Sequence, residues 1–309
     1  MTVTLAQLLG GRRVAGDVTI TGMTVDSRRV QPGDLFVALP GSKVDGRKFI
    51  NDAIKAGASA ILTTEGASVE GGGVPIIDDA NPRRRYAELA ARFYGAQPAT
   101  QVAVTGTNGK TSVADFTRQI WQAIGFEAAS IGTLGVRSTS VKRPGGLTTP
   151  DPMALHEVLT ELANKGVDHA AIEASSHGLD QYRLDGVRLQ AAAFTNLTRD
   201  HMDYHRTEQG YFYAKARLFG ELLAPGAGAV INVDDPWGLI LEDIAWARGL
   251  RILTVGFHEK AVLRLLRQDV TATGQTIDAL FGGKEYRVHL PLVGAFQAQN
   301  ALESPHKWQ

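Results

Sequence analysis

The segment at residues 105–112, Thr-Gly-Thr-Asn-Gly-Lys-Thr-Ser, has the residue types of a phosphate-binding loop. It follows an apolar run at 102–104 and precedes a helical pattern of apolar residues. A strand that leads through glycines into a helix aims backbone N–H groups at one point, where a phosphate can bind. Lys110 could reach the outer phosphates, and the Thr111 hydroxyl could bind magnesium. Because position 104 is valine, the spacing departs from G-x-x-x-x-G-K-[ST], and a simple strand-to-helix turn is the alternative.

Three side chains further along could serve the same chemistry. Glu173 ends an apolar run at 170–172, and strand ends in a parallel sheet meet at the ligand site, so its carboxylate could hold magnesium. The alternative is a helix-capping or salt-bridged glutamate. His201 lies in a segment with two histidines and two aspartates, which could indicate zinc, although the chain has no cysteine to complete such a site. Lys215 sits in a helical pattern whose apolar positions imply burial; taken alone, it is a solvated lysine.

The composition is that of a globular protein of about two domains, with 309 residues, 44% hydrophobic and 21% charged. The 32 basic and 32 acidic residues balance, which argues against nucleic acid or a membrane surface as a partner. The absence of cysteine excludes disulfides and thiolate chemistry. Neither a signal peptide nor a membrane span is expected, so the predicted location is the cytoplasm. The predicted oligomeric state is a monomer.

The elements that would position these residues fall into two groups. Residues 1–97 mix short strands with helices at 49–58 and 82–94, and a break at 95–98 suggests a domain boundary. From 101 on, short apolar strands alternate with helices, which indicates a mostly parallel sheet covered by helices on both faces. The expected strands are 102–104, 170–172, 192–194, 230–233 and 252–255, and the expected helices are 112–124, 153–164 and 211–223. Period-two patterns from about 260 to 290 predict an antiparallel extension.

The loop at 105–111 resembles the nucleotide loop of Mur ligases and folylpolyglutamate synthetases, which join an amine to a carboxylate through an acyl phosphate. For the Mur ligases, the resemblance implies catalytic roles for Glu173 and for His201, which would bind magnesium. Lys110 would be catalytic as well, and Lys215 would be carbamylated by carbon dioxide so that it helps to hold a second magnesium. The implied metal ligands are Thr111, Glu173, His201 and carbamylated Lys215. The implied ATP-binding residues are Gly106, Thr107, Asn108, Gly109, Lys110, Thr111, Ser112, Asp235 and Asn300.

The N-terminal segment at 25–39 is similar to the UDP-binding domain of the Mur ligases that add the third residue or the terminal dipeptide, and a folylpolyglutamate synthetase would not carry it. Segments at 147–151 and 173–183 resemble the muramoyl-substrate motifs of the third-residue ligases. The implied UDP-substrate residues are Ser27, Ser42, Lys43, Val44, Thr148, Thr149, Ser175, Gln181 and Arg183. The family often has histidine where this chain has Ser42. An unrelated P-loop NTPase is the lesser alternative.

The resemblance implies an α/β fold with a UDP-substrate domain at 1–97, a central P-loop ATP-binding domain at 98–303 and an aberrant tail at 304–309. The resemblance ends at about residue 302, where the family would continue a helix and add a Rossmann-like C-terminal domain, so that domain is expected to be missing. Pro305 would break this helix almost at its start. The implied activity is ATP-dependent ligation of meso-diaminopimelate or L-lysine to UDP-N-acetylmuramoyl-L-alanyl-D-glutamate, with two magnesium ions. The alternatives are a non-ligating fragment that binds UDP-substrate and ATP, and another Mur-type ligase.

Overall fold

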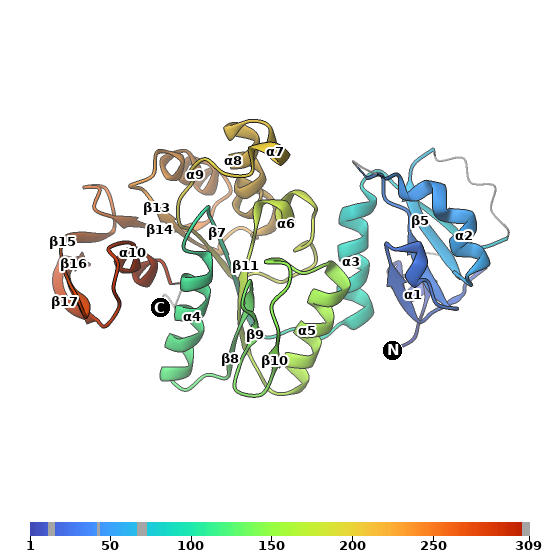
Figure 1. The fold of residues 1–309 in the computed structure, drawn as a ribbon, viewed down its shortest axis with the longest axis horizontal. Coiled ribbons are helices and arrows are strands. Elements are labelled where there is room, and N and C mark those ends of the chain that lie inside the picture. Colours follow the sequence, from blue (N-terminus) through green and yellow to red (C-terminus); the bar gives the residue numbers. More distant parts are fainter. Residues whose placement is uncertain (12–15, 42–43, 67–72, 305–309) are drawn as a thin grey trace. The chain divides into compact units, whose positions relative to one another are not determined.

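The computed structural model describes residues 1–11, 16–41, 44–66 and 73–304. The chain forms two compact units, each built around its own sheet (Figure 1). Unit 1 consists of residues 1–96, 151–160 and 181–186, and unit 2 consists of 97–150, 161–180 and the chain from 187 onward. This confirms the predicted α/β fold class. The predicted domains at 1–97 and 98–303 differ from the two units, because two later segments belong to unit 1.

Unit 1 contains a four-stranded parallel sheet of order β3-β4-β5-β6 and an antiparallel pair, β1 and β2. Its strands are β1 (Val3–Thr4), β2 (Thr19–Ile20), β3 (Gly22–Thr24), β4 (Asp34–Val37), β5 (Ala60–Thr64) and β6 (Ile76–Asp79). Its helices are α1 (Leu5–Leu8), η1 (Ser27–Arg29), η2 (Gly46–Phe49), α2 (Ile50–Lys55), α3 (Pro82–Tyr94) and the first part of α5 (Pro152–Asn164).

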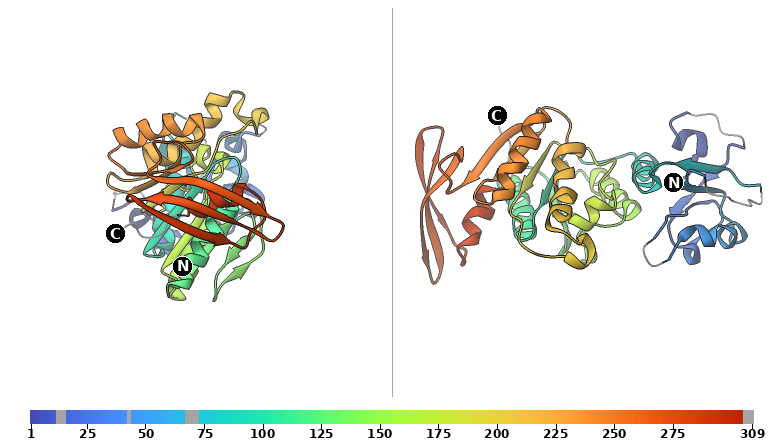
Figure 2. Two further views of the ribbon diagram at one scale, coloured as in Figure 1. Left: turned by 90° about the vertical axis from the view of Figure 1, so that its left-hand side faces the viewer. Right: turned by 90° about the horizontal axis from the view of Figure 1, so that it is seen from above.

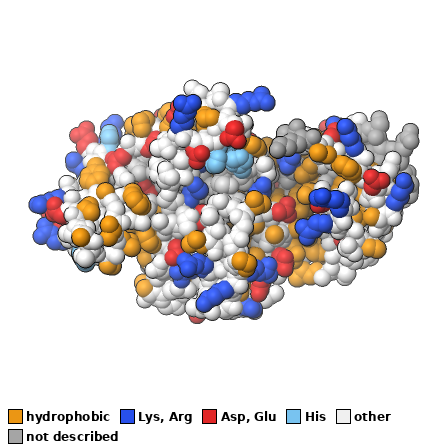
Figure 3. All heavy atoms as spheres, viewed as in Figure 1, with side chains coloured by type: hydrophobic (Ala, Val, Ile, Leu, Met, Phe, Trp, Pro, Cys, Tyr) orange, Lys and Arg blue, Asp and Glu red, His pale blue; other side chains and the backbone are white. Residues whose placement is uncertain are grey.

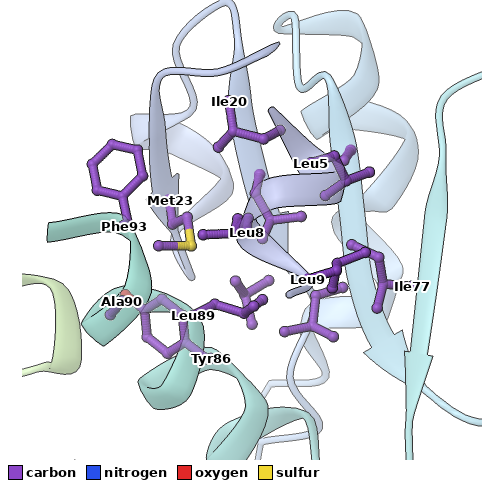
Figure 4. Close-up of a cluster of buried hydrophobic side chains, with 14 residues drawn as sticks. Leu5, Leu8, Leu9, Ile20, Met23, Ile77, Tyr86, Leu89, Ala90 and Phe93 are labelled. Atoms are coloured by element: carbon purple, nitrogen blue, oxygen red, sulfur yellow. The ribbon is translucent and has the colours of Figure 1, made fainter. Parts of the chain in front are cut away.

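Helix α3 supplies much of the core of unit 1. It begins with Pro82, and the side chain of Asn81 accepts a hydrogen bond from the Arg84 amide as an N-cap. The apolar stripe predicted from the sequence is buried, so that Tyr86, Leu89 and Phe93 pack with side chains of α1 and the sheet (Figure 4). The predicted helix at 82–94 is confirmed with the same bounds.

Hydrogen bonds explain why the two later segments belong to unit 1. The Tyr86 hydroxyl donates to the Asp151 carboxylate at 2.8 Å, and the Thr160 hydroxyl donates to the Ala96 carbonyl at 2.8 Å. Arg84 lies 3.3 Å from the carboxylate of Asp185. Groups 64 or more residues apart in sequence therefore meet, and a boundary read from local composition cannot reveal such pairs.

Unit 2 is built on an eleven-stranded sheet of order β10-β9-β8-β11-β7-β12-β13-β14-β15-β16-β17. Its strands are β7 (Thr100–Thr105), β8 (Ala128–Gly132), β9 (Gly135–Arg137), β10 (Lys142–Arg143), β11 (His169–Glu173), β12 (Ala191–Phe194), β13 (Gly228–Asn232), β14 (Arg251–Gly256), β15 (Leu263–Thr271), β16 (Gly274–Phe281) and β17 (Lys284–Leu290). Its helices are α4 (Lys110–Ala123), the end of α5, α6 (Ser176–Asp180), α7 (Met202–His205), α8 (Glu208–Arg217), the π-helix η3 (Leu218–Leu222), α9 (Pro236–Ala247) and α10 (Phe296–Leu302).

The predicted mostly parallel sheet is confirmed, because the seven strands from β8 to β15 in the sheet order pair in parallel. The sequence did not predict β8, and it assigned β15 to the antiparallel extension. Strand β7 lies between β11 and β12, with Glu173 opposite Val104 and Phe194 opposite Thr105. Because these three strands are in register at their carboxyl ends, the loops that follow them emerge side by side. The fold thereby brings the phosphate loop, Glu173 and the segment after β12 to one edge of the sheet.

The predicted antiparallel extension is confirmed as β15–β17, which is visible in Figure 2 as three long neighbouring strands at the end of the sheet. Its buried Leu265 and Ile277 pack against Ala298 of α10. Over the part of the chain that the structure describes, every helix is too short or too polar to cross a bilayer. Basic and acidic side chains are interspersed over the face shown in Figure 3.

Candidate active site

The loop between β7 and α4 has a backbone that requires glycine at two positions. Gly106 has φ +146° and Gly109 has φ +87°, a region that side chains with a Cβ rarely adopt. A Cβ on Gly106 would collide with the Thr195 hydroxyl, and one on Gly109 would collide with the amide oxygen of Asn300. Asn300 therefore lies next to this loop, and its role beside the nucleotide stays a prediction.

The segment after β12 holds the loop in place. The Asn196 carbonyl accepts a hydrogen bond from the Thr107 amide at 2.8 Å, and its side-chain oxygen accepts one from the Asn108 amide at 3.0 Å. The Thr195 hydroxyl donates to the Asn108 carbonyl. The N–H groups in the first turn of α4 have no acceptor within the helix, so they can bind an anion.

Two lysine amines converge on a single carbonyl of the loop. Lys110 donates to the Gly106 carbonyl at 2.9 Å and to the Thr107 carbonyl at 2.7 Å. Lys215, from α8, donates to the same Gly106 oxygen at 2.7 Å. Burial lowers the pKa of Lys110, although Glu173 and Asp200 oppose that shift. A positive charge on Lys110 is placed where the negative charge of a triphosphate would compensate it.

The side chain of Lys215 is among the most deeply buried in the protein, since the residue is only 1% exposed. Its amine lies 4.3 Å from the centre of the Tyr211 ring, which partly compensates a positive charge. Burial lowers the pKa of Lys215 well below its usual range, and the neighbouring charge of Lys110 lowers it further. The site therefore favours the neutral amine, which is the form that reacts with carbon dioxide.

The Glu173 carboxylate connects the loop to the next turn of the sheet. One oxygen accepts hydrogen bonds from the hydroxyls of Thr111 (2.9 Å) and Thr133 (3.1 Å), and the other accepts from the Thr133 amide at 3.0 Å. Hydroxyl and carboxylate oxygens are the ligands that Mg²⁺ prefers, so Thr111 and Glu173 fit the predicted metal site.

His201 lies beside this site in a cluster of aromatic rings. The rings of His201 and Tyr211 are 6.1 Å apart, and the Tyr211 hydroxyl lies 3.2 Å from the Thr107 hydroxyl. His177 makes ring contacts with His201 (4.8 Å) and His205 (5.5 Å). Among the described residues, no three histidine, aspartate or glutamate side chains are grouped to hold a metal. The role of His201 as a magnesium ligand stays a prediction.

A cavity of about 440 Å³ in unit 2 contains the expected nucleoside contact Asp235. The cavity is lined by Asn196, Leu197, Thr198, Glu208, Asn232, Asp234, Asp235, Pro236, Trp237 and Gln299. Both carboxylate oxygens of Asp235 accept backbone hydrogen bonds, from Leu197 at 2.6 Å and from Trp237 at 2.9 Å. Asp235 therefore caps α9 and shapes the cavity wall, while Trp237 offers an aromatic surface.

The predicted muramoyl-substrate residues of unit 2 adjoin Glu173. The buried Thr149 hydroxyl donates to the Glu173 carbonyl at 2.9 Å and lies 3.0 Å from the Ser175 hydroxyl. The Thr148 hydroxyl lies 3.1 Å from that of Thr133. The structure thus brings Thr148, Thr149 and Ser175 together next to the carboxylate proposed to hold magnesium.

The remaining predicted substrate residues belong to unit 1 or lie outside the described residues. Arg183 donates to the Gln181 side chain at 2.7 Å, and Ser27 begins η1. A cavity of about 550 Å³ in unit 1 is lined in part by Thr24, Val25 and Asp26, the residues immediately before Ser27. Val44 is 58% exposed. Ser42 and Lys43, which are also predicted to bind the UDP-substrate, lie outside the described residues.

With this geometry established, the comparisons with known proteins become informative. Residues 104–304 match the family described as Mur ligase middle domain, and residues 19–94 match Mur ligase family, catalytic domain. The chain belongs to the Mur ligase family. It is 54% identical over 288 residues to the UDP-N-acetylmuramoyl-L-alanyl-D-glutamate–2,6-diaminopimelate ligase of Bradyrhizobium diazoefficiens, in a match that covers 92% of this chain and 59% of that protein.

Solved structures of Mur ligases show the same architecture. The structure of a UDP-N-acetylmuramoyl-L-alanyl-D-glutamate–2,6-diaminopimelate ligase matches with a TM-score of 0.86 and 30% identity, over 98% of this chain and 63% of that one. The MurF ligase from Thermotoga maritima in complex with ADP matches at a TM-score of 0.59 and 20% identity, over 91% of this chain and 61% of that one, which shows a shared fold. This Mur ligase chain spans about three fifths of the length of these relatives.

Sequence reasoning missed several residues that shape this Mur ligase site. They are Thr133, Asn196, Tyr211 and Gln299. The signal for Asn196 was present, because it follows a predicted apolar strand and strand ends converge in a parallel sheet. Thr133 gave no comparable signal. It lies in the two-residue turn between β8 and β9, and neither of these strands was predicted.

Proposed function

We propose that this chain supplies the nucleotide-binding and acceptor-binding parts of an ATP-dependent ligase. Its substrates are UDP-N-acetylmuramoyl-L-alanyl-D-glutamate, meso-diaminopimelate and ATP, and its role is in peptidoglycan precursor synthesis. The observation that carries the proposal is the Glu173 carboxylate, which bonds Thr111 of the phosphate loop and Thr133, the neighbour of Thr148 on the acceptor side. The names of the relatives support diaminopimelate over lysine as the amino acid that is added.

The reaction that fits this arrangement has two steps. A free glutamate carboxylate of the UDP-dipeptide attacks the γ-phosphorus of ATP, which forms an acyl phosphate and releases ADP. The amine of diaminopimelate then attacks the acyl carbon, and inorganic phosphate leaves as the amide bond forms. Lys110 and the helix N-terminus of α4 would stabilise negative charge on the transferring phosphoryl group.

The residues present fit a magnesium-dependent transfer. Thr111, Glu173, His201 and carbamylated Lys215 would hold two Mg²⁺ ions, which would neutralise phosphate charge. The burial of Lys215 supports carbamylation, because carbon dioxide adds to a neutral amine and a proton is released. The carbamate would replace a buried amine by an oxygen ligand that matches Mg²⁺.

The remaining proposed roles concern binding. The nucleotide would be held by the loop from Gly106 to Ser112, with Asp235 and Asn300 on the nucleoside side. The UDP-dipeptide would be held by Ser27, Ser42, Lys43, Val44, Thr148, Thr149, Ser175, Gln181 and Arg183. We also propose that the protein is a cytoplasmic monomer that binds neither nucleic acid nor membrane. The balance of 32 basic and 32 acidic residues supports the last point.

The test is phosphate release from ATP by the 309-residue chain, measured with the UDP-dipeptide, Mg²⁺, bicarbonate and either diaminopimelate or lysine. The expected result is release that requires both the UDP-dipeptide and diaminopimelate. Release with lysine instead would overturn the choice of amino acid. Binding of UDP-dipeptide and ATP without release would assign this chain a binding role alone, and the absence of binding would overturn the proposal.

A further inference from the structure

Thr133 makes a two-point contact with the Glu173 carboxylate. Its amide donates to one oxygen at 3.0 Å, and its hydroxyl donates to the other at 3.1 Å. Glu173 is only 2% exposed, whereas Thr133 lies at the surface in the turn between β8 and β9. A single exposed threonine therefore contacts both oxygens of a buried carboxylate, one of which also accepts from Thr111.

The glycines on either side of the turn make this contact possible. Gly132 pairs with Gly135 at the end of the hairpin. A Cβ on Gly132 would overlap the Glu173 carboxylate, and a Cβ on Gly135, which has φ +85°, would overlap the backbone of Arg143 and Pro144. Glu173 thus lies directly against the hairpin backbone, and the turn is fitted to the carboxylate.

The Thr133 hydroxyl also contacts the acceptor side of the site. It lies 3.1 Å from the Thr148 hydroxyl, and either oxygen can donate. A hydroxyl has one proton, so Thr133 donates either to Glu173 or to Thr148, and it donates to Glu173 when Thr148 donates to it. The next residue, Thr149, separately donates to the Glu173 carbonyl at 2.9 Å. Whatever fixes the Thr148 hydroxyl therefore also fixes the proton that orients Glu173.

We propose that Thr133 is a positioning residue that couples acceptor binding to the binding of Mg²⁺–ATP. This inference rests on the proposed function. In this proposal the UDP-dipeptide fixes the rotamer of Thr148 without accepting its proton. The Thr148 hydroxyl then donates to Thr133, and the Thr133 hydroxyl donates to Glu173. The Glu173 carboxylate is then held in one orientation beside Thr111. Its side chain therefore loses less conformational entropy when a cation binds there. Coupling of this kind is reciprocal, so each ligand tightens the binding of the other.

The test measures the affinity of a non-hydrolysable ATP analogue with Mg²⁺, by calorimetry, with and without saturating UDP-dipeptide. Four versions of the 309-residue chain are compared: wild type, Thr133→Val, Thr133→Ser and Thr139→Val. Valine keeps the shape and the amide of Thr133 but removes its hydroxyl, and serine restores the hydroxyl. Thr139→Val is the matched control, because Thr139 is an exposed threonine beyond the other end of β9 whose hydroxyl donates to Glu127.

The expected result is that the UDP-dipeptide tightens analogue binding by about fivefold or more in wild type, Thr133→Ser and Thr139→Val. In Thr133→Val the tightening should fall below about twofold, with an unchanged melting temperature. Coupling retained in a folded Thr133→Val, or absent from a wild type that binds both ligands, would overturn the inference alone. A wild type that binds neither ligand would overturn the proposed function and this inference with it.

Discussion

Lys215 shows how burial can prepare a side chain for chemistry. A charged amine with 1% of its surface exposed loses its hydration, and the nearby Lys110 adds repulsion. The Gly106 carbonyl at 2.7 Å and the Tyr211 ring at 4.3 Å offer only partial compensation. The lowered pKa therefore keeps a neutral amine available at a pH where exposed lysines, with a pKa of about 10.4, stay protonated.

We predict a carbamate on Lys215 in protein equilibrated with ¹³C-bicarbonate near neutral pH. A single carbamate carbon resonance should appear in the ¹³C NMR spectrum and should be lost in Lys215→Met, which keeps the length of the side chain. Acidification should remove the resonance, because protonation consumes the neutral amine that carbon dioxide requires. Lys165→Met, which removes a lysine that pairs with Glu161 away from Lys215, is the control and should keep the resonance; a wild-type spectrum without it would contradict the carbamate.

At the scale of elements, the phosphate loop depends on backbone shapes that only glycine adopts at low cost. Gly109 is the N-cap of α4 at φ +87°, and the Asn300 side chain occupies the space where its Cβ would stand. Gly125, just after the same helix, has a similar φ of +93° but has no atom near the position of a Cβ. A substitution at Gly125 would therefore cause backbone strain alone, whereas one at Gly109 would cause both strain and a collision with Asn300.

We predict that Gly109→Ala weakens nucleotide binding at least tenfold and that Gly125→Ala leaves it unchanged. Both substitutions force alanine into a left-handed conformation, so each should lower the unfolding free energy by about 1–2 kcal/mol. Only Gly109→Ala also displaces Asn300 from the loop. Chemical denaturation and calorimetric titration with the nucleotide measure the two effects. Equal nucleotide affinity in both variants would contradict the placement of the nucleotide at this loop.

The elements were largely predictable because their signals are local. Apolar runs gave β7, β11, β12, β13 and β14 but not β8, and the predicted helix at 82–94 is α3 with the same bounds. The approach of Glu173 to the loop followed from the rule that parallel strands share a ligand edge. The contact of Thr133 with Glu173 could not be predicted, because it depends on how a two-residue turn meets a strand 40 residues away. The capping role of Asp235 was overlooked, although aspartate before proline is a helix-start signal.

At the scale of the whole molecule, the two proposed ligands draw on different parts of the chain. Every described residue proposed for the nucleotide belongs to unit 2, whereas Ser27, Gln181 and Arg183, proposed for the UDP-dipeptide, belong to unit 1. Thr148, Thr149 and Ser175, which are also proposed for the UDP-dipeptide, belong to unit 2. A substitution in one set should therefore leave the direct binding of the other ligand intact when each ligand is titrated alone.

We predict that Lys110→Ala weakens ATP binding about 10- to 100-fold, the loss expected for a charge-assisted contact of about 1.5–3 kcal/mol. The affinity for UDP-dipeptide, titrated without nucleotide, should change less than about twofold. Arg183→Ala is the converse variant, because its guanidinium can pair with the anionic UDP-dipeptide and lies in the other unit. It should weaken UDP-dipeptide binding and spare ATP. If either folded variant lost both ligands equally, the two sites could not be separate, and the assignment of residues to them would have to be redrawn.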